Sequence, residues 1–304
     1  MNIKRIAILG AGGLGAAYGS RFLDGPGFET QFIARGERLE RLRRDGLIVN
    51  GRLLDPPVID PDDAEVKTAD LIIVALKQHH LAGALPDLDR FVGEQTIILS
   101  VMNGLDSEAL IGARYGMEKT LYAIALGIDA LREGNRIDYS AGGKIFFGEA
   151  RNDPPSEKVK HVQEALDRAK IPNEVPDDME HVMWRKFMIN VGINQASAVL
   201  GAPYGVFQQD AGAQAIMESL MREAIAVANA EGVALSEADL QGWYDFLNTL
   251  SPHGKTSMLQ DVEAGRKTEV ELFGVKVVEL GRKHSIPTSV NQTLAAIIQV
   301  WERI

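Results

Sequence analysis

The stretch Ile6-Ala7-Ile8-Leu9-Gly10-Ala11-Gly12-Gly13-Leu14-Gly15 decides the fold of this chain. A short apolar run, typical of a buried parallel strand, leads into a GxGxxG pattern, and a helical pattern follows. The first glycine permits a tight turn, the second lets the backbone approach a pyrophosphate, and the third allows close helix–sheet packing. The helix N-terminus would then offer amide donors to the anion. The pattern predicts dinucleotide binding by Gly10, Ala11, Gly12, Gly13, Leu14 and Gly15, against the alternative of a glycine-rich turn without a ligand.

Further short apolar runs alternate with helical patterns through the first half of the chain. The expected strands are 3–9, 30–34, 71–76, 96–101 and 121–126, and the expected helices are 14–23, 37–45 and 107–115. This alternation predicts an α/β domain with a Rossmann-like, doubly wound parallel sheet. Asn50-Gly51 predicts a hairpin, and another antiparallel pair is expected between 136–139 and 144–148, across Gly142-Gly143.

Strand patterns almost vanish after Pro176. Long helical patterns take over at 178–200, 211–231, 236–250, 268–284 and 289–303. A chain of 304 residues is also long enough to split into two cores. We therefore expect a Rossmann-like domain over residues 1–176 and an all-helical domain over residues 177–304.

Composition excludes several classes of function. A net charge of −10 argues against a nucleic-acid partner, because such binding depends on neutralising phosphates. Cysteine is absent and the six histidines form no HExxH pattern, so no metal site is predicted. The apolar run 6–9 is too short for a signal-peptide core, and polar residues interrupt the longest uncharged stretch, 187–209. We expect a cytoplasmic protein without a membrane partner. The helical domain leaves both a monomer and a homodimer open.

The residue after the second expected strand bears on the choice of cofactor. An acidic residue there would bond the ribose 2′-OH of NAD, but this chain has Arg35. A guanidinium can grip a 2′-phosphate with two hydrogen bonds, so Arg35 favours NADP(H), with Arg38 as a candidate assistant. The alternative is a solvated helix start, since Glu37 and Glu40 lie among the arginines.

Two more polar residues follow expected strands. Lys77 comes after 71–76 and Asn103 after 96–102, and ligands bind at this carboxyl edge in open α/β sheets. Lys77 is a candidate for contact with a carboxylate or the cofactor, and Asn103 for contact with ribose or substrate. Polar residues also commonly end strands, so both readings stand at this point.

The expected helix 178–200 is apolar around most of its circumference. Lys186, Asn190 and Asn194 nevertheless form a polar stripe with a spacing of four residues. Burying such groups without partners would cost roughly 1–3 kcal/mol for each neutral amide and more for the ammonium. The stripe is therefore expected to line a wet cleft, with pairing to neighbouring helices as the alternative.

Taken together, GAGGLG, Arg35, Lys77 in ALKQHH, Asn103 in VMNGL, WRKFMINVGINQ and KTSMLQDVEAGRKTEVE resemble the ketopantoate reductase family. The resemblance spans nearly the whole chain. The most specific part of it is the order of Lys186, Asn190, Asn194, Ser257 and Glu269. It implies a dinucleotide-binding domain joined to a helical domain, with the active site between them.

The resemblance also implies residue roles. Lys186 would be the general acid that protonates the ketone oxygen while NADPH delivers hydride to the carbonyl carbon. Asn190, Asn194 and Ser257 would hold the substrate, and Asn103 would touch both substrate and cofactor. Lys77 and the backbone of Ala130 would contact the cofactor, and Glu269 would bond cofactor, substrate or both.

These features favour reduction of ketopantoate, a 2-oxo acid, to pantoate in pantothenate and coenzyme A synthesis. A related NADPH-dependent reductase of another 2-oxo acid is one alternative. A non-catalytic NADPH-binding sensor is the other.

Overall fold

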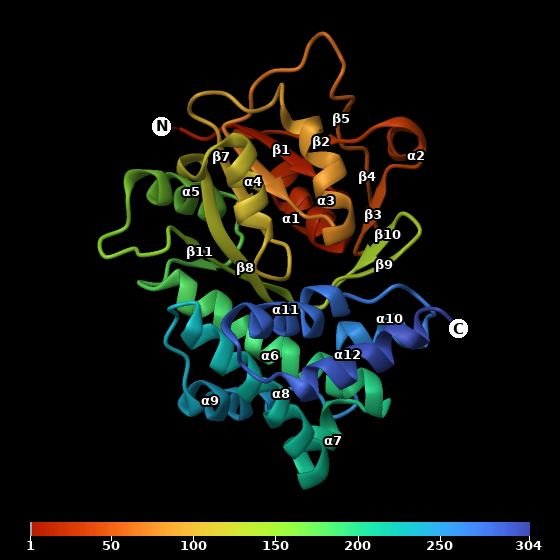
Figure 1. Cartoon of the computed structure of the whole chain (residues 1–304). Coiled ribbons are helices and arrows are strands. Elements are labelled where there is room, and N and C mark those ends of the chain that lie inside the picture. The colour runs from red at the N-terminus through yellow and green to blue at the C-terminus, as the bar shows by residue number, and fades with distance from the viewer. Residues whose placement is uncertain (1) are drawn as a thin grey trace. The chain divides into compact units, whose positions relative to one another are not determined.

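The computed structural model describes residues 2–304, which form two compact units (Figure 1). The first unit ends at Glu180, and the second covers His181–Ile304. Each has its own architecture. The expectation of a Rossmann-like sheet followed by an all-helical region is confirmed.

An eight-stranded sheet organises the first unit, with the order β12-β11-β8-β7-β6-β1-β2-β5. Its strands are β1 (Arg5–Leu9), β2 (Glu29–Ile33), β5 (Val58–Ile59), β6 (Leu71–Val74), β7 (Ile97–Ser100), β8 (Thr120–Ile128), β11 (Gly142–Gly148) and β12 (Asn173–Glu174). From β5 to β8 all neighbours are parallel, and β11 runs antiparallel to β8. The chain leaves β1 for β2 on one side and returns to β6 on the other. This reversal makes the carboxyl end of β1 the topological switch point.

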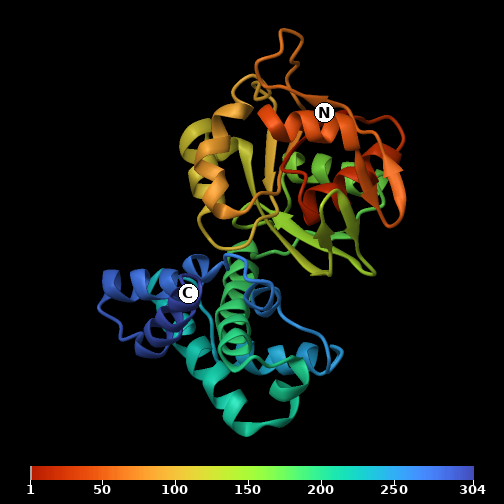
Figure 2. The same cartoon turned by 90° about the vertical axis from the view of Figure 1, so that its right-hand side faces the viewer.

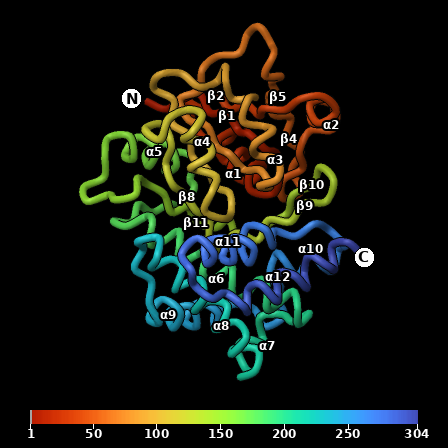
Figure 3. Tube along the Cα trace, viewed as in Figure 1, coloured from red at the N-terminus to blue at the C-terminus, as the bar shows by residue number. Residues whose placement is uncertain are grey.

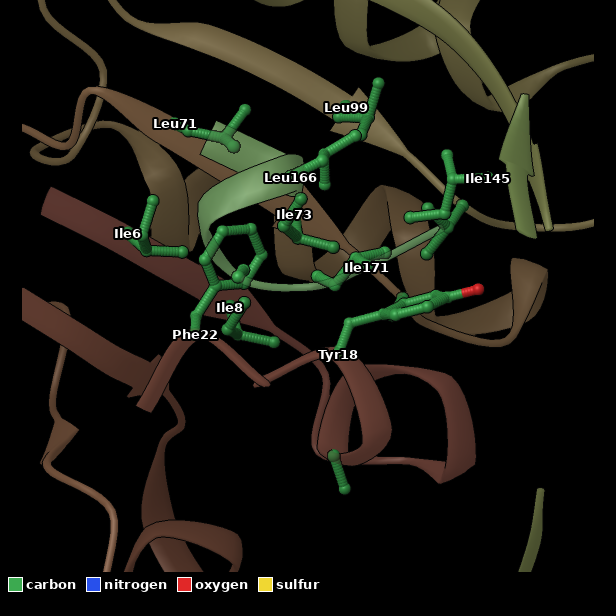
Figure 4. Packing of buried hydrophobic residues seen from close by; sticks show 14 of the residues in the cluster. Ile6, Ile8, Tyr18, Phe22, Leu71, Ile73, Leu99, Ile145, Leu166 and Ile171 are labelled. Carbon is green, nitrogen blue, oxygen red and sulfur yellow. The ribbon is translucent and has the colours of Figure 1, made fainter. Parts of the chain in front are cut away.

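Helices cover both faces of this sheet. They are α1 (Gly13–Asp24), α2 (Gly36–Asp45), α3 (Gln78–Ala84), α4 (Ser107–Tyr115) and α5 (Glu157–Arg168), with short 3₁₀ turns η1 (Leu85–Leu88) and η2 (Met117–Lys119). Alternate residues of β1 enter different cores, as the two-residue period of a strand requires. Ile6 and Ile8 pack with Tyr18 and Phe22 of α1 (Figure 4), whereas Ala7 joins the core on the opposite face.

A second, four-stranded sheet has the order β4-β3-β10-β9. It contains β3 (Leu47–Val49), β4 (Arg52–Leu54), β9 (Leu131–Glu133) and β10 (Arg136–Asp138), whose trace Figure 3 shows. The hairpin at Asn50-Gly51 is confirmed as β3–β4.

The expected pairing of 136–139 with 144–148 is wrong. β10 pairs with β9 and β3, whereas β11 pairs with β8 and β12. Gly143 is part of β11 rather than a turn, and a Cβ there would lie 2.6 Å from the carbonyl oxygen of Leu126 on β8. The glycine therefore permits a close approach of two strands.

The second unit is helical. Its elements are α6 (Met179–Leu200), α7 (Tyr204–Gln209), α8 (Ala211–Ala230), α9 (Glu237–Leu247), α10 (Ser257–Glu263), η3 (Val270–Leu272), α11 (Gly274–His284) and α12 (Ser289–Trp301). The expected helix 268–284 is divided, because Phe273 leaves helical geometry between η3 and α11. None of the helices within residues 2–304 has both the length and the apolar composition needed to cross a membrane.

Close backbone contact and a buried polar network fix α6, the long green helix in Figure 2. A Cβ on Gly192 would lie 2.5 Å from Cγ of Met221, so glycine lets α8 approach closely. Gln195 Nε2 donates to Asn291 Oδ1 at 2.8 Å, and the carboxylate of Glu223 accepts the backbone N–H of Asn291 at 2.9 Å. Buried hydrogen bonds of this kind hold a helix in one rotational setting.

Candidate active site

Five of the predicted site residues meet at one edge of the large sheet. Gly10, Arg35, Lys77, Asn103 and Ala130 follow β1, β2, β6, β7 and β8 respectively. These strands are mutually parallel, so their carboxyl ends share an edge. Sequence order alone placed these residues in separate motifs, and the topology brings them together.

The glycine turn fits the pyrophosphate of a dinucleotide. Gly10 has φ of 108°, and a Cβ there would lie 2.4 Å from Ala75 O. A Cβ on Gly15 would lie 1.8 Å from Gly10 O, so the helix can start this close only with glycine. At Gly12, the N-cap of α1, the nearest atom to a Cβ is 3.9 Å away. The first amides of α1 therefore face an open cradle suited to an anion.

Arg35 lies at the end of β2 and is the N-cap residue of α2. Its guanidinium forms ion pairs with both Asp62 and Asp87, and Nη2 also donates to Asp62 Oδ1 at 3.2 Å. The hydrogen bonds that Arg35 donates to Asp62 and then to Asp87 raise the pKa of Arg35 further, while Arg35 lowers the pKa of Asp62. The predicted phosphate ligand thus already has two anionic partners.

Lys77 and Asn103 occupy the loops after neighbouring strands. Lys77 is the N-cap residue of α3. Asn103 lies in a loop whose two ends are joined by buried hydroxyl groups. Ser100 Oγ and Ser107 Oγ are 2.8 Å apart, and Ser107 Oγ donates to Glu108 Oε2 at 2.8 Å. This polar support restricts the loop that carries Asn103.

The predicted polar stripe lies on one face of α6. At about 100° per residue, Lys186, Asn190 and Asn194 span one side, and Gly192, which packs on α8, points in roughly the opposite direction. Among residues 2–304, no group hydrogen-bonds to the side-chain amide of Asn190 or Asn194, although only 6% of Asn194 is exposed. Amides in this state are suited to a polar ligand.

Ser257 is linked to the same face of α6. Ser197 continues the stripe by helical geometry, and its hydroxyl accepts a hydrogen bond from Thr256 Oγ1 at 3.1 Å. Thr256 also caps α10 by accepting the N–H of Leu259 at 3.1 Å. Ser257, the exposed first residue of α10, is therefore held beside the end of the stripe.

Glu269 precedes η3 as its N-cap residue. The segment that follows packs on α6, where the rings of Phe187 and Phe273 lie 6.4 Å apart. Thr268 anchors the other side, since its backbone N–H donates to Glu302 Oε1 at 2.7 Å. The second unit thus holds Lys186 on α6, and it holds Ser257 and Glu269 on segments that contact α6.

Sequence reasoning missed several residues near the carboxyl edge of the large sheet. Asp62 pairs with Arg35 from the turn after β5 and Asp87 from η1, and Arg132 Nη1 donates to Ala11 O in the glycine turn at 2.6 Å. Only contacts between distant segments identify them, because no local motif contains them. In the part of the chain that the structure describes, His, Asp and Glu side chains nowhere gather in threes as metal ligands would.

A glycine cradle on a Rossmann-like sheet, followed by a helical unit with a lysine–amide stripe, defines a class of nicotinamide-dependent oxidoreductases. Family comparison gives the particular family. The model described as "Ketopantoate reductase PanE/ApbA" matches residues 6–152, and "Ketopantoate reductase PanE/ApbA C terminal" matches residues 178–302. The chain belongs to the ketopantoate reductase PanE/ApbA family.

Individual relatives cover almost the whole chain. A 2-dehydropantoate 2-reductase of Halobacterium salinarum is 28% identical over 98% of this chain and 99% of its own. A ternary structure of D-mandelate dehydrogenase with NADH and anilino(oxo)acetate is similar with a TM-score of 0.88 at 20% identity, covering 98% of both chains. A dimeric ketopantoate reductase from Staphylococcus aureus gives 0.82 at 19%, covering 98% and 99%. The two structures show a shared fold.

Proposed function

We propose that this chain is an NADPH-dependent reductase that converts 2-dehydropantoate to pantoate, a step of pantothenate and coenzyme A synthesis. The observation that carries the proposal is the stripe on α6, where Lys186 lies in line with two amides that have no hydrogen-bond partner in residues 2–304. An ammonium group next to amide donors and acceptors suits a substrate with a carbonyl and a hydroxyl group.

In this proposal Lys186 donates a proton to the carbonyl oxygen of the substrate. The nicotinamide cofactor, when bound, supplies the hydride that adds to the carbonyl carbon. The ammonium stabilises the negative charge that develops on the oxygen. Asn190 and Asn194 orient the substrate by hydrogen bonds to its oxygen atoms, and Ser257 binds the carboxylate end. Asn103 contacts substrate and cofactor.

The glycine turn, Arg35, Lys77, Ala130 and Glu269 hold the cofactor in this proposal. The preference for NADPH rests on the positive charge after β2, where NAD-preferring folds have an acid. The D-mandelate dehydrogenase with NADH makes the opposite preference a specific alternative, which direct binding of both cofactors would decide.

Reduction of another 2-oxo acid is the second candidate function. The likeness to D-mandelate dehydrogenase favours this candidate, since a differently shaped pocket on the same fold would take a different side chain. In either case we expect a cytoplasmic enzyme. The dimeric Staphylococcus aureus reductase makes a homodimer the proposed assembly, which light scattering would test.

A panel of 2-oxo acids, assayed with NADPH and with NADH, tests the reaction. We expect NADPH oxidation with 2-dehydropantoate and the highest kcat/KM for that acid. Turnover of a different acid alone would select the second candidate. Cofactor binding without turnover of any acid would contradict a reductase and indicate a sensor.

Substitution of the proposed acid tests the mechanism. Lys186→Ala should lower kcat by roughly 10² to 10⁴, the usual worth of a positioned general acid, and leave the Kd of NADPH nearly unchanged. The matched control is Lys160→Ala, since that exposed lysine of α5 pairs only with Glu157 nearby. Equal kcat values for the two variants would contradict the role of Lys186.

A further inference from the structure

The charge of Arg35 is offset where it stands. Asp62 and Asp87 both pair with its guanidinium, so the three groups together carry a net charge of −1. The side chain of Asp87 is only 16% exposed and that of Asp62 73%, so Asp62 is the more solvent-accessible partner. A dianionic phosphate at Arg35 would have to compete with both carboxylates. Net attraction for such a group must come from other cations at this edge.

Three other arginines supply that charge. Arg38 and Arg41 lie on α2, and Arg132 lies on β9. Within residues 2–304, no carboxylate lies within ion-pair distance of any of the three. Most other arginines of this acidic chain do pair with Asp or Glu, Arg114 with Asp89 being one example. The three therefore form a cationic cluster whose members have no ion-pair partner within residues 2–304, although Asp45 lies within electrostatic range of Arg41.

Arg38 and Arg132 are half-buried, Arg41 is exposed, and the three side chains act electrostatically on one another. Burial, and then the charges of Arg38 and Arg41, lower the pKa of Arg132. Burial and the charge of Arg41 lower the pKa of Arg38. His80, at the start of α3, has its pKa lowered by burial and by the charges of His79 and Arg38. Arg38 therefore lies within electrostatic range of both α3 and β9, and an anion among these groups would relieve their mutual repulsion.

Arg132 is fixed against the glycine turn. Its Nη1 donates to Ala11 O at 2.6 Å and its Nε donates to Gly134 O at 2.8 Å. The same segment covers the start of α1, because a Cβ on Gly13 would lie 3.1 Å from Ala130 O. A guanidinium has five N–H donors, so three remain on Arg132 in a preorganised fork.

We propose that Arg132 and Arg38 bind the 2′-phosphate of NADP(H), and that they determine the preference for NADPH over NADH more than Arg35 does. Arg41 adds to the local positive charge. The phosphate brings about two negative charges to a cluster of three cations, and charge-assisted hydrogen bonds to a planar guanidinium suit its oxygens. The inference rests on the proposed function only in that the glycine turn must bind a nicotinamide dinucleotide.

Dissociation constants of NADPH and NADH, measured without substrate, test the inference. Arg132→Gln and Arg38→Gln should each weaken NADPH on the order of tenfold, as expected for a lost charged hydrogen bond, and change NADH by less than about threefold. Arg132→Lys keeps the charge but loses the fork, so it should fall between wild type and Arg132→Gln. Arg114→Gln, whose arginine pairs with Asp89, is the control and should change neither constant.

Three results would overturn the inference. Equal weakening of both cofactors would assign Arg132 to the pyrophosphate or to the support of the turn. An unchanged NADPH preference in both variants would remove the cluster from recognition. Loss of the entire preference in Arg35→Gln alone would return the role to Arg35.

The proposed reductase function fails separately from the inference. Tight, phosphate-dependent binding of NADPH with no turnover of any 2-oxo acid would keep the cluster and reject the reaction. A wild-type protein that binds neither dinucleotide would overturn both.

Discussion

Asp62 determines how much positive charge Arg35 presents at the end of β2. Replacing the Asp62 carboxylate by Asp62→Asn should leave Arg35 with one carboxylate partner, Asp87, and tighten NADPH by about twofold to fivefold, the usual range for an exposed ion pair, with little effect on NADH. Titration at low ionic strength would show the effect best, because salt screens exposed charges.

The neighbouring Asp63 provides a matched control. It pairs with Arg43 at 3.6 Å rather than with Arg35, so Asp63→Asn should leave NADPH affinity unchanged. If Asp62→Asn weakens NADPH, the carboxylate assists binding and the competition described here does not exist.

At the level of single residues, the sequence identified candidates but not their partners. Arg35 follows a strand and could be placed from local pattern. Its partners Asp62 and Asp87 lie 27 and 52 residues further along the chain. Arg132 reaches Ala11 across 121 residues. Contacts over such separations depend on how the chain folds back, which a period of two or of 3.6 residues does not encode.

The turn between β1 and α1 is the element most sensitive to substitution. Gly15→Ala would place a Cβ 1.8 Å from Gly10 O, so α1 would have to move away from the turn. We expect loss of cofactor binding and a lower unfolding temperature, measured by calorimetry.

Gly83→Ala in α3 is the control for this glycine. A Cβ there meets no atom within 4 Å, and the helix gains about 0.8–1 kcal/mol from alanine. A stable Gly15→Ala variant with normal NADPH affinity would contradict the packing argument.

The junction of α8 and α11 gives the second unit a dependence on acid. Glu231, at the end of α8, is paired with His284 and, at 2.6 Å, with Lys283. Hydrogen bonds from Lys283 and then His284 lower the pKa of Glu231 below its ordinary value of about 4.5. The ionised Glu231 therefore stabilises the fold fully at a pH above its pKa in the unfolded chain. This stabilisation is lost as the pH falls through its lower pKa in the folded chain.

Urea unfolding of wild type and Glu231→Gln tests this contribution. We expect the wild type to be more stable by about 1 kcal/mol near neutral pH, a value discounted for partial exposure. The difference should begin to shrink as the pH falls below about 4.5 and should disappear once the pH is below the folded pKa of Glu231. A constant difference across the acidic range would exclude titration of Glu231 as the cause.

At the level of elements, local pattern predicted most strands of the large sheet, but not β5, and most helices of the second unit. It failed where pairing or packing decides. The segment of β10 was predicted to pair with that of β11, but β10 pairs with β9 and β3. The helix predicted over 268–284 breaks at Phe273, and the glycine that follows it faces Gln195 and Ala295. The α6 stripe was predictable because helical spacing alone defines it.

The chain folds into two compact units, so we expect more than one unfolding transition for the whole molecule. All three tryptophans, Trp184, Trp243 and Trp301, belong to the second unit. Fluorescence therefore reports on that unit, whereas circular dichroism reports on both.

Most residues of the proposed cofactor site, all except Glu269, belong to the first unit, and this predicts a difference between the two signals. NADPH at 100 times its Kd should stabilise the first unit by about 2.7 kcal/mol through mass action. The dichroism midpoint should rise more than the tryptophan midpoint. Equal shifts would mean that the units unfold together.

The hydrogen bond between Thr256 and Ser197 has a practical consequence for redesign of substrate range. It connects the beginning of α10 to α6, so the position of Ser257 depends on α6. Mutant libraries aimed at new acids should therefore keep the threonine and diversify Ser257 with the loop before it, 251–255. Selection would then sample new pocket shapes while the hydrogen bond that positions α10 is retained.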